Sequence, residues 1–140
     1  MEDYKLSKSS TKNIKGIRQE IIILIKRVLI KSPHDFGIPQ NGGLRTAQQQ
    51  NKLYYMTPSV TQLDGFNKVS YHQSGNAVDI FVYDEHGACW DCIKKYKEIA
   101  DLMKIEFQLM QDEGIFKCEE RIIWGGDWIR FVDRPHFEIR

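Results

Sequence analysis

The chain has 140 residues, of which 41% are hydrophobic and 28% are charged. This length suits one domain with a sizeable core, and the composition excludes a collagen-like or wholly disordered chain. Twenty basic and 19 acidic residues give a net charge of +1, which argues against a dedicated nucleic-acid binder because such domains concentrate positive charge. We therefore expect a single soluble domain over residues 1–140.

The first 32 residues are predicted to contain a basic segment and a core helix. Residues 1–31 carry eight basic and three acidic side chains, a net charge of +5, and the remaining 12 basic and 16 acidic side chains sum to −4. This segment either contacts an anionic envelope surface or forms a solvated helix face. Apolar residues within it recur at helical spacing, at Ile17, Ile21, Leu24, Ile25, Val28 and Leu29. Because proline disfavours helix in the residue before it, the helix should end ahead of Ser32-Pro33.

Neither a secretory signal nor a membrane span is predicted. The first ten residues contain no apolar run of the kind that signal peptides have. The most apolar stretch, residues 21–30, is interrupted by Lys26 and Arg27 and is shorter than the roughly 20 residues that span a bilayer. We therefore expect a protein that is made in the cytoplasm and is not stably inserted in a membrane.

The remaining elements are predicted from turn residues and apolar periodicity. Residues 33–68 are rich in Gly, Pro, Asn, Gln and Asp and should be mostly loop, with a short helix near Thr46–Leu53. Apolar residues from Ile93 to Met110 step by three and four, which predicts a long helix with Asp91 as its N-cap and Gly114 closing it. Four strands are expected, over Val69–His72, Ala77–Tyr83, Arg121–Trp124 and His136–Ile139. This order indicates an α+β domain, a small mostly antiparallel sheet flanked by helices.

Three cysteines occur, Cys89, Cys92 and Cys118, and an odd number without a signal peptide favours reduced thiols. Cys89 and Cys92 have the spacing of a redox motif but lack the preceding strand of a thioredoxin-like unit. Together with His86 and Cys118 they could instead form a structural zinc knuckle. Of these alternatives we expect ordinary packed thiols.

Two histidines and one carboxylate are candidates for a common site. Alternation along Ala77–Tyr83 directs the branched aliphatic residues to the core and Asp79 to the opposite face. In the last strand, alternation likewise separates Phe137 from His136, and His72 precedes Asp79 by one tight turn. Two histidines and one carboxylate are a common catalytic zinc set with the fourth position open to water. By spacing alone, however, such residues are more often surface or hydrogen-bonded groups.

Residues 70–79 have the pattern Ser-x-His-x-x-Gly-x-Ala-x-Asp, and residues 133–137 follow far downstream as Asp-x-Pro-His-Phe. These patterns resemble the superfamily of zinc D-Ala-D-Ala carboxypeptidases and L-alanyl-D-glutamate peptidases. Its phage endolysin branch is further matched by four blocks, at Asp35–Ile38, Gly42–Gln50, Asp64-Gly65 and Trp124–Trp128. The matches keep their order over nearly the whole chain. The resemblance therefore implies the metallopeptidase fold that this superfamily shares with hedgehog-type zinc domains, and no separate targeting domain.

The resemblance also implies one bound zinc ion and hydrolysis of the bond between L-Ala and D-Glu in the stem peptides of bacterial cell walls. By position, His72, Asp79 and His136 would be the zinc ligands. Asp133 would carry a proton between water and the departing amine, and Arg45 would stabilise the carbonyl oxygen as it becomes an oxyanion. Further candidates are Ser70 and Gln48 for orienting ligands or substrate, and Asp127 for a structural role. Glu138 shares the face of His136 and should either contact a ligand or lie at the surface rather than bind metal itself.

Two other functions stay open at this point. A D,D-carboxypeptidase on the same scaffold would release D-Ala, and a zinc-containing wall-binding domain would have no turnover. The presence of Asp133 argues against the second, because a binding module has no use for a positioned proton carrier. The ligand set also occurs with non-haem iron, so zinc rests on the resemblance.

For an endolysin we expect a monomer whose partner is bacterial peptidoglycan, with no nucleic acid bound. It would be made in the host cytoplasm and would reach the wall after a separate holin has permeabilised the membrane.

Overall fold

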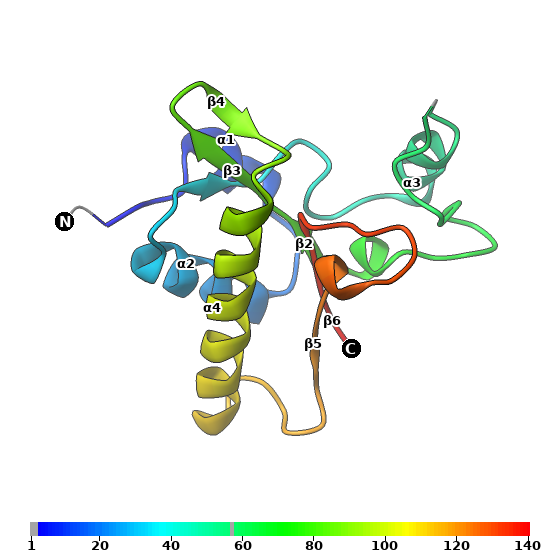
Figure 1. The fold of residues 1–140 in the computed structure, drawn as a ribbon. Helices are drawn as coiled ribbons and strands as arrows, with labels where there is room; N and C mark the ends of the chain where they lie inside the picture. Colours follow the sequence, from blue (N-terminus) through cyan, green and yellow to red (C-terminus); the bar gives the residue numbers. More distant parts are fainter. Residues whose placement is uncertain (1–2, 57) are drawn as a thin grey trace.

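Two small antiparallel sheets and two long helices form the fold (Figure 1). The computed structural model describes residues 3–56 and 58–140; the first two residues of the predicted basic segment and Thr57 of the predicted loop region lie outside the described residues. The helices are α1 Lys8–Asn13, α2 Gln19–Lys31, α3 Ala47–Tyr54 and α4 Ile93–Asp112, with short 3₁₀ turns η1 Tyr71–Ser74 and η2 Gly125–Asp127. The strands are β1 Phe36–Gly37, β2 Ala77–Asp79, β3 Phe81–Asp84, β4 Gly87–Cys89, β5 Ile122–Trp124 and β6 His136–Ile139. The predicted α+β class is confirmed.

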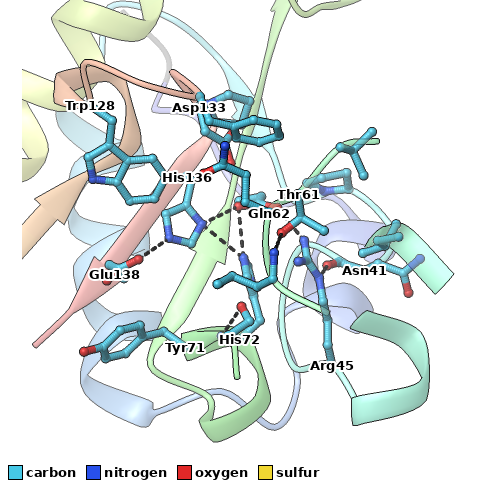
Figure 2. Close-up of a pocket in the computed structure, with 18 of the residues that line it drawn as sticks. Asn41, Arg45, Thr61, Gln62, Tyr71, His72, Trp128, Asp133, His136 and Glu138 are labelled. Atoms are coloured by element: carbon cyan, nitrogen blue, oxygen red, sulfur yellow. Dashed lines mark hydrogen bonds and ion pairs between the residues drawn. The ribbon is translucent and has the colours of Figure 1, made fainter. Parts of the chain in front are cut away.

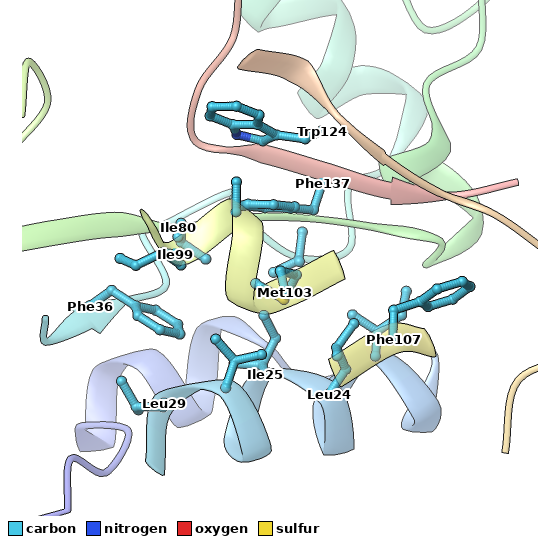
Figure 3. Packing of buried hydrophobic residues seen from close by; sticks show 14 of the residues in the cluster. Leu24, Ile25, Leu29, Phe36, Ile80, Ile99, Met103, Phe107, Trp124 and Phe137 are labelled. Carbon is cyan, nitrogen blue, oxygen red and sulfur yellow. The ribbon is translucent and has the colours of Figure 1, made fainter. Parts of the chain in front are cut away.

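The core lies where α2 packs against α4 (Figure 3). Both helices occupy the predicted stretches: α2 ends at Lys31, before Ser32-Pro33, and α4 is followed by Gly114 in a left-handed conformation, with φ +78°. Leu24 and Ile25 of α2 face Met103 of α4, and all three are almost fully buried. Full burial of one such side chain contributes about 1.5–3 kcal/mol, so this helix pair is a major source of stability.

The strand predicted over Ala77–Tyr83 is divided between the two sheets. Its first part, β2, joins the sheet β2-β6-β5, and its second part, β3, joins the sheet β1-β3-β4. The chain changes sheets at Ile80, whose N–H donates to the Pro135 carbonyl oxygen at 2.9 Å. Val78, Ile80 and Val82 are all buried, as alternation predicts, because the backbone stays extended through the change.

The strand predicted over Val69–His72 was wrong. Residues 71–74 form the 3₁₀ turn η1 instead, because side chains at both of its ends bind the backbone. The Ser70 hydroxyl accepts from the His72 N–H at 3.2 Å, and the Gln73 side-chain oxygen accepts from the Ser70 N–H at 2.9 Å. Gly75 then reverses the chain at φ +78°, a conformation that glycine adopts without steric cost.

Three short elements carry too little periodicity to be recognised in the sequence: α1, β1 and β4. Helix α1 supports the loop that follows β1. The Ser10 hydroxyl accepts from the Ile38 N–H at 2.9 Å, and the Asn13 side chain donates to the Ile38 carbonyl at 2.8 Å. A Cβ at Gly43 would lie 2.3 Å from the Asn13 carbonyl oxygen, so glycine is required where this loop crosses α1.

The expectation of three reduced thiols was wrong for Cys89 and Cys92, which form a disulfide. Cys89 ends β4 and Cys92 caps α4, and the turn between them brings their Cα atoms to 5.8 Å, a separation that suits a disulfide. The N-cap of α4 is Cys92, one residue after the predicted Asp91. Cys118 is an exposed free thiol and the His86 side chain is 84% exposed, so the zinc knuckle does not form.

Within residues 3–56 and 58–140, no helix has the length and apolar character needed to cross a membrane.

Replacing Ile25 by Ala should lower the free energy of unfolding by about 2–5 kcal/mol, because it opens a cavity between α2 and α4. Urea unfolding followed by circular dichroism measures this change. Ile30 lies on the same helix but is 53% exposed, so the matched variant Ile30→Ala should change stability by less than about 1 kcal/mol. Equal losses in both variants would contradict the described packing.

The disulfide predicts how the protein reacts with a thiol-alkylating reagent. Denatured but unreduced protein should take up one alkyl group, on Cys118, and reduced protein should take up three. Intact-mass spectrometry distinguishes the two results, and peptide mapping identifies the labelled cysteine. Three labels before reduction would show that Cys89 and Cys92 are thiols.

Candidate metal centre

Three potential ligand atoms converge where β2 pairs with β6 (Figure 2). The register of this antiparallel pair places Asp79 directly opposite His136, and the turn η1 supplies His72. His72 Nε2 and His136 Nδ1 each lie 3.1 Å from Asp79 Oδ1, and the two nitrogens lie 3.2 Å apart. The structure therefore brings together the three residues that the sequence patterns single out as metal ligands.

The size of this triangle fits a tetrahedral metal ion. In such a site, bonds of about 2.0–2.1 Å to nitrogen and oxygen place neighbouring ligand atoms about 3.3 Å apart. The observed separations of 3.1, 3.1 and 3.2 Å are close to that edge length. All three side chains also line a cavity, which would leave a fourth position for water or substrate.

Outer hydrogen bonds of the two imidazoles leave His72 Nε2 and His136 Nδ1 as the atoms that face Asp79. His72 Nδ1 lies 2.8 Å from the Gly43 carbonyl oxygen, an acceptor, so this nitrogen donates and Nε2 is the atom that faces Asp79. His136 Nε2 lies 2.7 Å from Glu138 Oε1 and donates to that carboxylate, so Nδ1 faces the other two ligand atoms. Such outer partners fix the tautomer and orientation of metal-binding histidines.

The electrostatics of the cluster favour a cation at its centre. Burial disfavours the charged form of Asp79, but the imidazoles of His72 and His136 hold the pKa of this carboxyl well below its usual range. Burial likewise opposes protonation of His136, yet hydrogen bonds to Asp79 and Glu138 outweigh it and raise the pKa of His136 to about 9. A site that attracts positive charge this strongly suits a metal ion with oxygen and nitrogen ligands.

The loop between β1 and α3 supports the ligands through its backbone. The Gly42 carbonyl accepts from the Asp79 N–H at 2.7 Å, and the Arg45 N–H donates to the His72 carbonyl at 3.1 Å. Together with the bond from His72 to Gly43, these contacts connect one short loop to two of the three ligands. This support depends on folding and is invisible in the spacing of the residues.

Arg45 contacts one of the three candidate metal ligands directly. One terminal nitrogen donates to Asp79 Oδ2 at 2.7 Å, the other to Gln50 Oε1 at 2.9 Å, and Nε donates to the Asn41 carbonyl at 2.6 Å. Gln50 is fully buried, whereas the predicted Gln48 is exposed and does not line the cavity. Both glutamines lie in α3, whose N-cap is Thr46; residue type and spacing in the sequence did not distinguish them.

Asp133 lies on the rim of the same cavity, whose volume is about 750 Å³. Its backbone N–H donates to the Gly125 carbonyl at 3.0 Å, and a Cβ at Gly125 would lie 2.2 Å from the Asp133 carbonyl oxygen, so this close approach needs glycine. Burial first, and then the negative charge of Asp79, raise the pKa of Asp133 to about 6. A carboxyl with a pKa near neutrality suits proton transfer.

The remaining residues that the sequence singled out, Ser70 and Asp127, lie at and near the cavity. Ser70 lines the cavity and caps the turn that carries His72. Asp127 pairs with Lys104 at 2.6 Å, a contact that joins η2 to α4. The sequence patterns did not single out Trp128, whose ring lies 5.2 Å from that of His136 between ring centres. Apolar residues complete the cavity wall, among them Leu53, Met56, Val60, Leu63, Trp90 and Phe131.

The chain is similar to a known protein family and to several solved structures. A family model described as phage L-alanyl-D-glutamate peptidase matches residues 2–139. A crystal structure of the L-Ala D-Glu endopeptidase ChiX from Serratia marcescens superposes with a TM-score of 0.74 at 24% sequence identity. The match covers 99% of this chain and 92% of that chain, so the two proteins share their fold over nearly their whole length.

Replacing Glu138 by Gln should weaken metal binding about 10- to 100-fold, because the charged partner of His136 Nε2 is lost. Competition between the protein and a chromophoric chelator for Zn²⁺ measures this affinity. Glu119 is also acidic but is exposed and distant from the cavity lining, so Glu119→Gln is the matched control and should bind Zn²⁺ like the unmodified protein. Equal affinities in all three proteins would show that Glu138 does not support the metal.

Proposed function

Because the chain belongs to the family of phage L-alanyl-D-glutamate peptidases, we propose that it is a zinc-dependent endopeptidase that hydrolyses the L-Ala–D-Glu bond of peptidoglycan stem peptides. The observation that carries the proposal is the convergence of His72, Asp79 and His136 at a cavity that also holds Asp133. This arrangement combines a metal-ligand set with an adjacent proton carrier, which are the parts that metal-assisted peptide hydrolysis requires.

One zinc ion would be held by His72 Nε2, Asp79 Oδ1 and His136 Nδ1. Two neutral imidazoles and one carboxylate would leave a net positive charge on a zinc centre. Bound zinc would lower the pKa of a coordinated water from about 15.7 to about 7 and polarise the scissile carbonyl. Gly43 and Glu138 keep the imidazoles in the tautomers that this binding needs.

Asp133 would act as the proton carrier of the reaction. In its ionised form it accepts a proton from the attacking water, and it then passes a proton to the nitrogen of the departing D-Glu. Its burial and its closeness to the charge of Asp79 raise its pKa toward neutrality, which favours both transfers. Proton transfer by a positioned group contributes typically about 10²–10⁴-fold to the rate.

Arg45 would contribute in two ways. Its bond to Asp79 Oδ2 holds the carboxylate so that Oδ1 faces the histidines. The Arg45 side chain also lines the cavity. There its positive charge would stabilise the scissile carbonyl oxygen as negative charge develops on that oxygen. Preorganised donors of this kind are worth about 3–4 kcal/mol each when they face the reacting atom.

The biological role we propose is host-cell lysis at the end of a phage infection. A monomer made in the host cytoplasm would reach peptidoglycan after a separate holin has permeabilised the membrane. The family description supports the phage origin.

Digestion of purified sacculi tests the activity. Mass spectrometry of the released fragments should find new N-terminal D-Glu, and a chelator should abolish its release until Zn²⁺ is restored. Release of free D-Ala instead would identify a D,D-carboxypeptidase. Binding to sacculi without any new end group would identify a wall-binding domain.

The variant Asp133→Asn should keep one zinc ion per chain and lose about 10²–10⁴-fold in activity on sacculi, since an amide cannot carry the proton. Metal analysis and the rate of D-Glu release are measured on the same preparation. Asp127 lies in the same segment but pairs with Lys104 and does not line the cavity, so Asp127→Asn is the matched control and should stay active. Full activity of Asp133→Asn would remove this residue from the mechanism.

A further inference from the structure

Three arginines line the cavity, and two of them are already paired with carboxylates. Arg45 donates to Asp79 at 2.7 Å, and Arg140 donates through Nε to Glu138 at 2.7 Å. Arg140 also lies over the ring of Tyr71, 5.4 Å from its centre. Ion pairs with Asp79 and Glu138 therefore hold the side chains of Arg45 and Arg140 in place.

Arg130 differs from these two arginines. Among the described residues it has no ion-pair partner and no side-chain hydrogen bond, although it lines the same cavity. Three carboxylates line the cavity. Asp79 is paired with Arg45 and the histidines, and Glu138 with His136 and Arg140. Asp133 forms no ion pair with Arg130. A cation that faces a cavity without an internal partner is available for an anionic group of a ligand.

The backbone fixes the loop that carries Arg130. The Gly125 carbonyl accepts from the N–H groups of both Trp128 and Asp133, at 3.2 and 3.0 Å, so the two ends of the loop bind one oxygen. Between them Phe131 has φ +51°, a left-handed conformation that bulky residues rarely adopt. Such conformations persist where the surrounding structure imposes them, and they cluster at ligand sites.

We propose that Arg130 binds the free carboxylate of the glutamate residue on the amine side of the scissile bond. This inference rests on the proposed function. Glutamate has two carboxyl groups, and only one continues the stem peptide, so the substrate presents a carboxylate close to the departing nitrogen. Arg130 and the proton carrier of that nitrogen, Asp133, share one short loop, which places Arg130 on the leaving-group side of the cavity. Arginine is well suited to this role because its planar guanidinium binds a carboxylate through two parallel hydrogen bonds.

Two synthetic stem peptides test the proposal, one with the free glutamate carboxylate and one with a carboxamide in its place. The unmodified protein should cleave the carboxylate peptide with a kcat/KM roughly 10- to 100-fold higher. Arg130→Ala should lose that preference by slowing cleavage of the carboxylate peptide alone, and Arg130→Lys should restore part of it. Zinc content and thermal unfolding should be unchanged, because Arg130 is exposed and forms no hydrogen bond or ion pair with the proposed ligands among the described residues.

Arg121→Ala is the matched control. Arg121 is exposed, has no ion-pair partner among the described residues and does not line the cavity, so this variant should keep the preference for the carboxylate peptide. If Arg130→Ala slows both peptides equally or neither of them, the assignment of Arg130 is wrong while the endopeptidase function stands. If the unmodified, zinc-loaded protein cleaves neither peptide nor sacculi, the proposed function itself fails.

Discussion

The register between β2 and β6 is the constraint on which the rest of the structure depends. The same pairing sets Val78 opposite Phe137 and Asp79 opposite His136. Val78 and Phe137 are buried in the core that α2 and α4 complete, and Asp79 and His136 lie on the other face. A slip by one residue would exchange the two faces, moving the apolar pair out of the core and placing the polar pair against it. Core burial therefore holds the register, and the register holds two of the three ligand atoms together.

Buried polar groups of this kind are costly unless they are paired. Each of the three candidate ligands has a hydrogen-bond or ion-pair partner from another part of the chain or the same strand. Gly43 binds His72, Glu138 binds His136 and Arg45 binds Asp79. Arg140 in turn holds Glu138. These contacts fix which atom of each side chain faces the centre. A bound metal ion would be stabilised by the same contacts that stabilise the fold, so that metal binding and folding are expected to be coupled.

Two of the loops that line the cavity lack regular structure but are held at defined points. One loop crosses α1 at Gly43, where a side chain would clash with the Asn13 carbonyl, and the other closes on the carbonyl of Gly125. The first loop carries Arg45, and the second carries Arg130 and Asp133. Groups that would act on the substrate thus lie on loops, while the three ligands are fixed by β2, β6 and the turn η1. This division leaves the loops free to differ in substrate preference without disturbing the ligands.

Local patterns in the sequence determined the long helices and the faces of the strands. The apolar spacing of α2 and α4, with Pro33 and Gly114 as end signals, needs no knowledge of the rest of the chain, and alternation around Asp79 and His136 likewise depends on a few neighbours. Tertiary structure alone decided the change of sheet at Ile80 and the contact of Arg45 with Asp79, which lies 34 residues away in the chain. It also selected Gln50 rather than Gln48 as the partner of Arg45. The physical reason is that each of these outcomes depends on how distant segments pack, and residue type and spacing within one segment do not specify that packing.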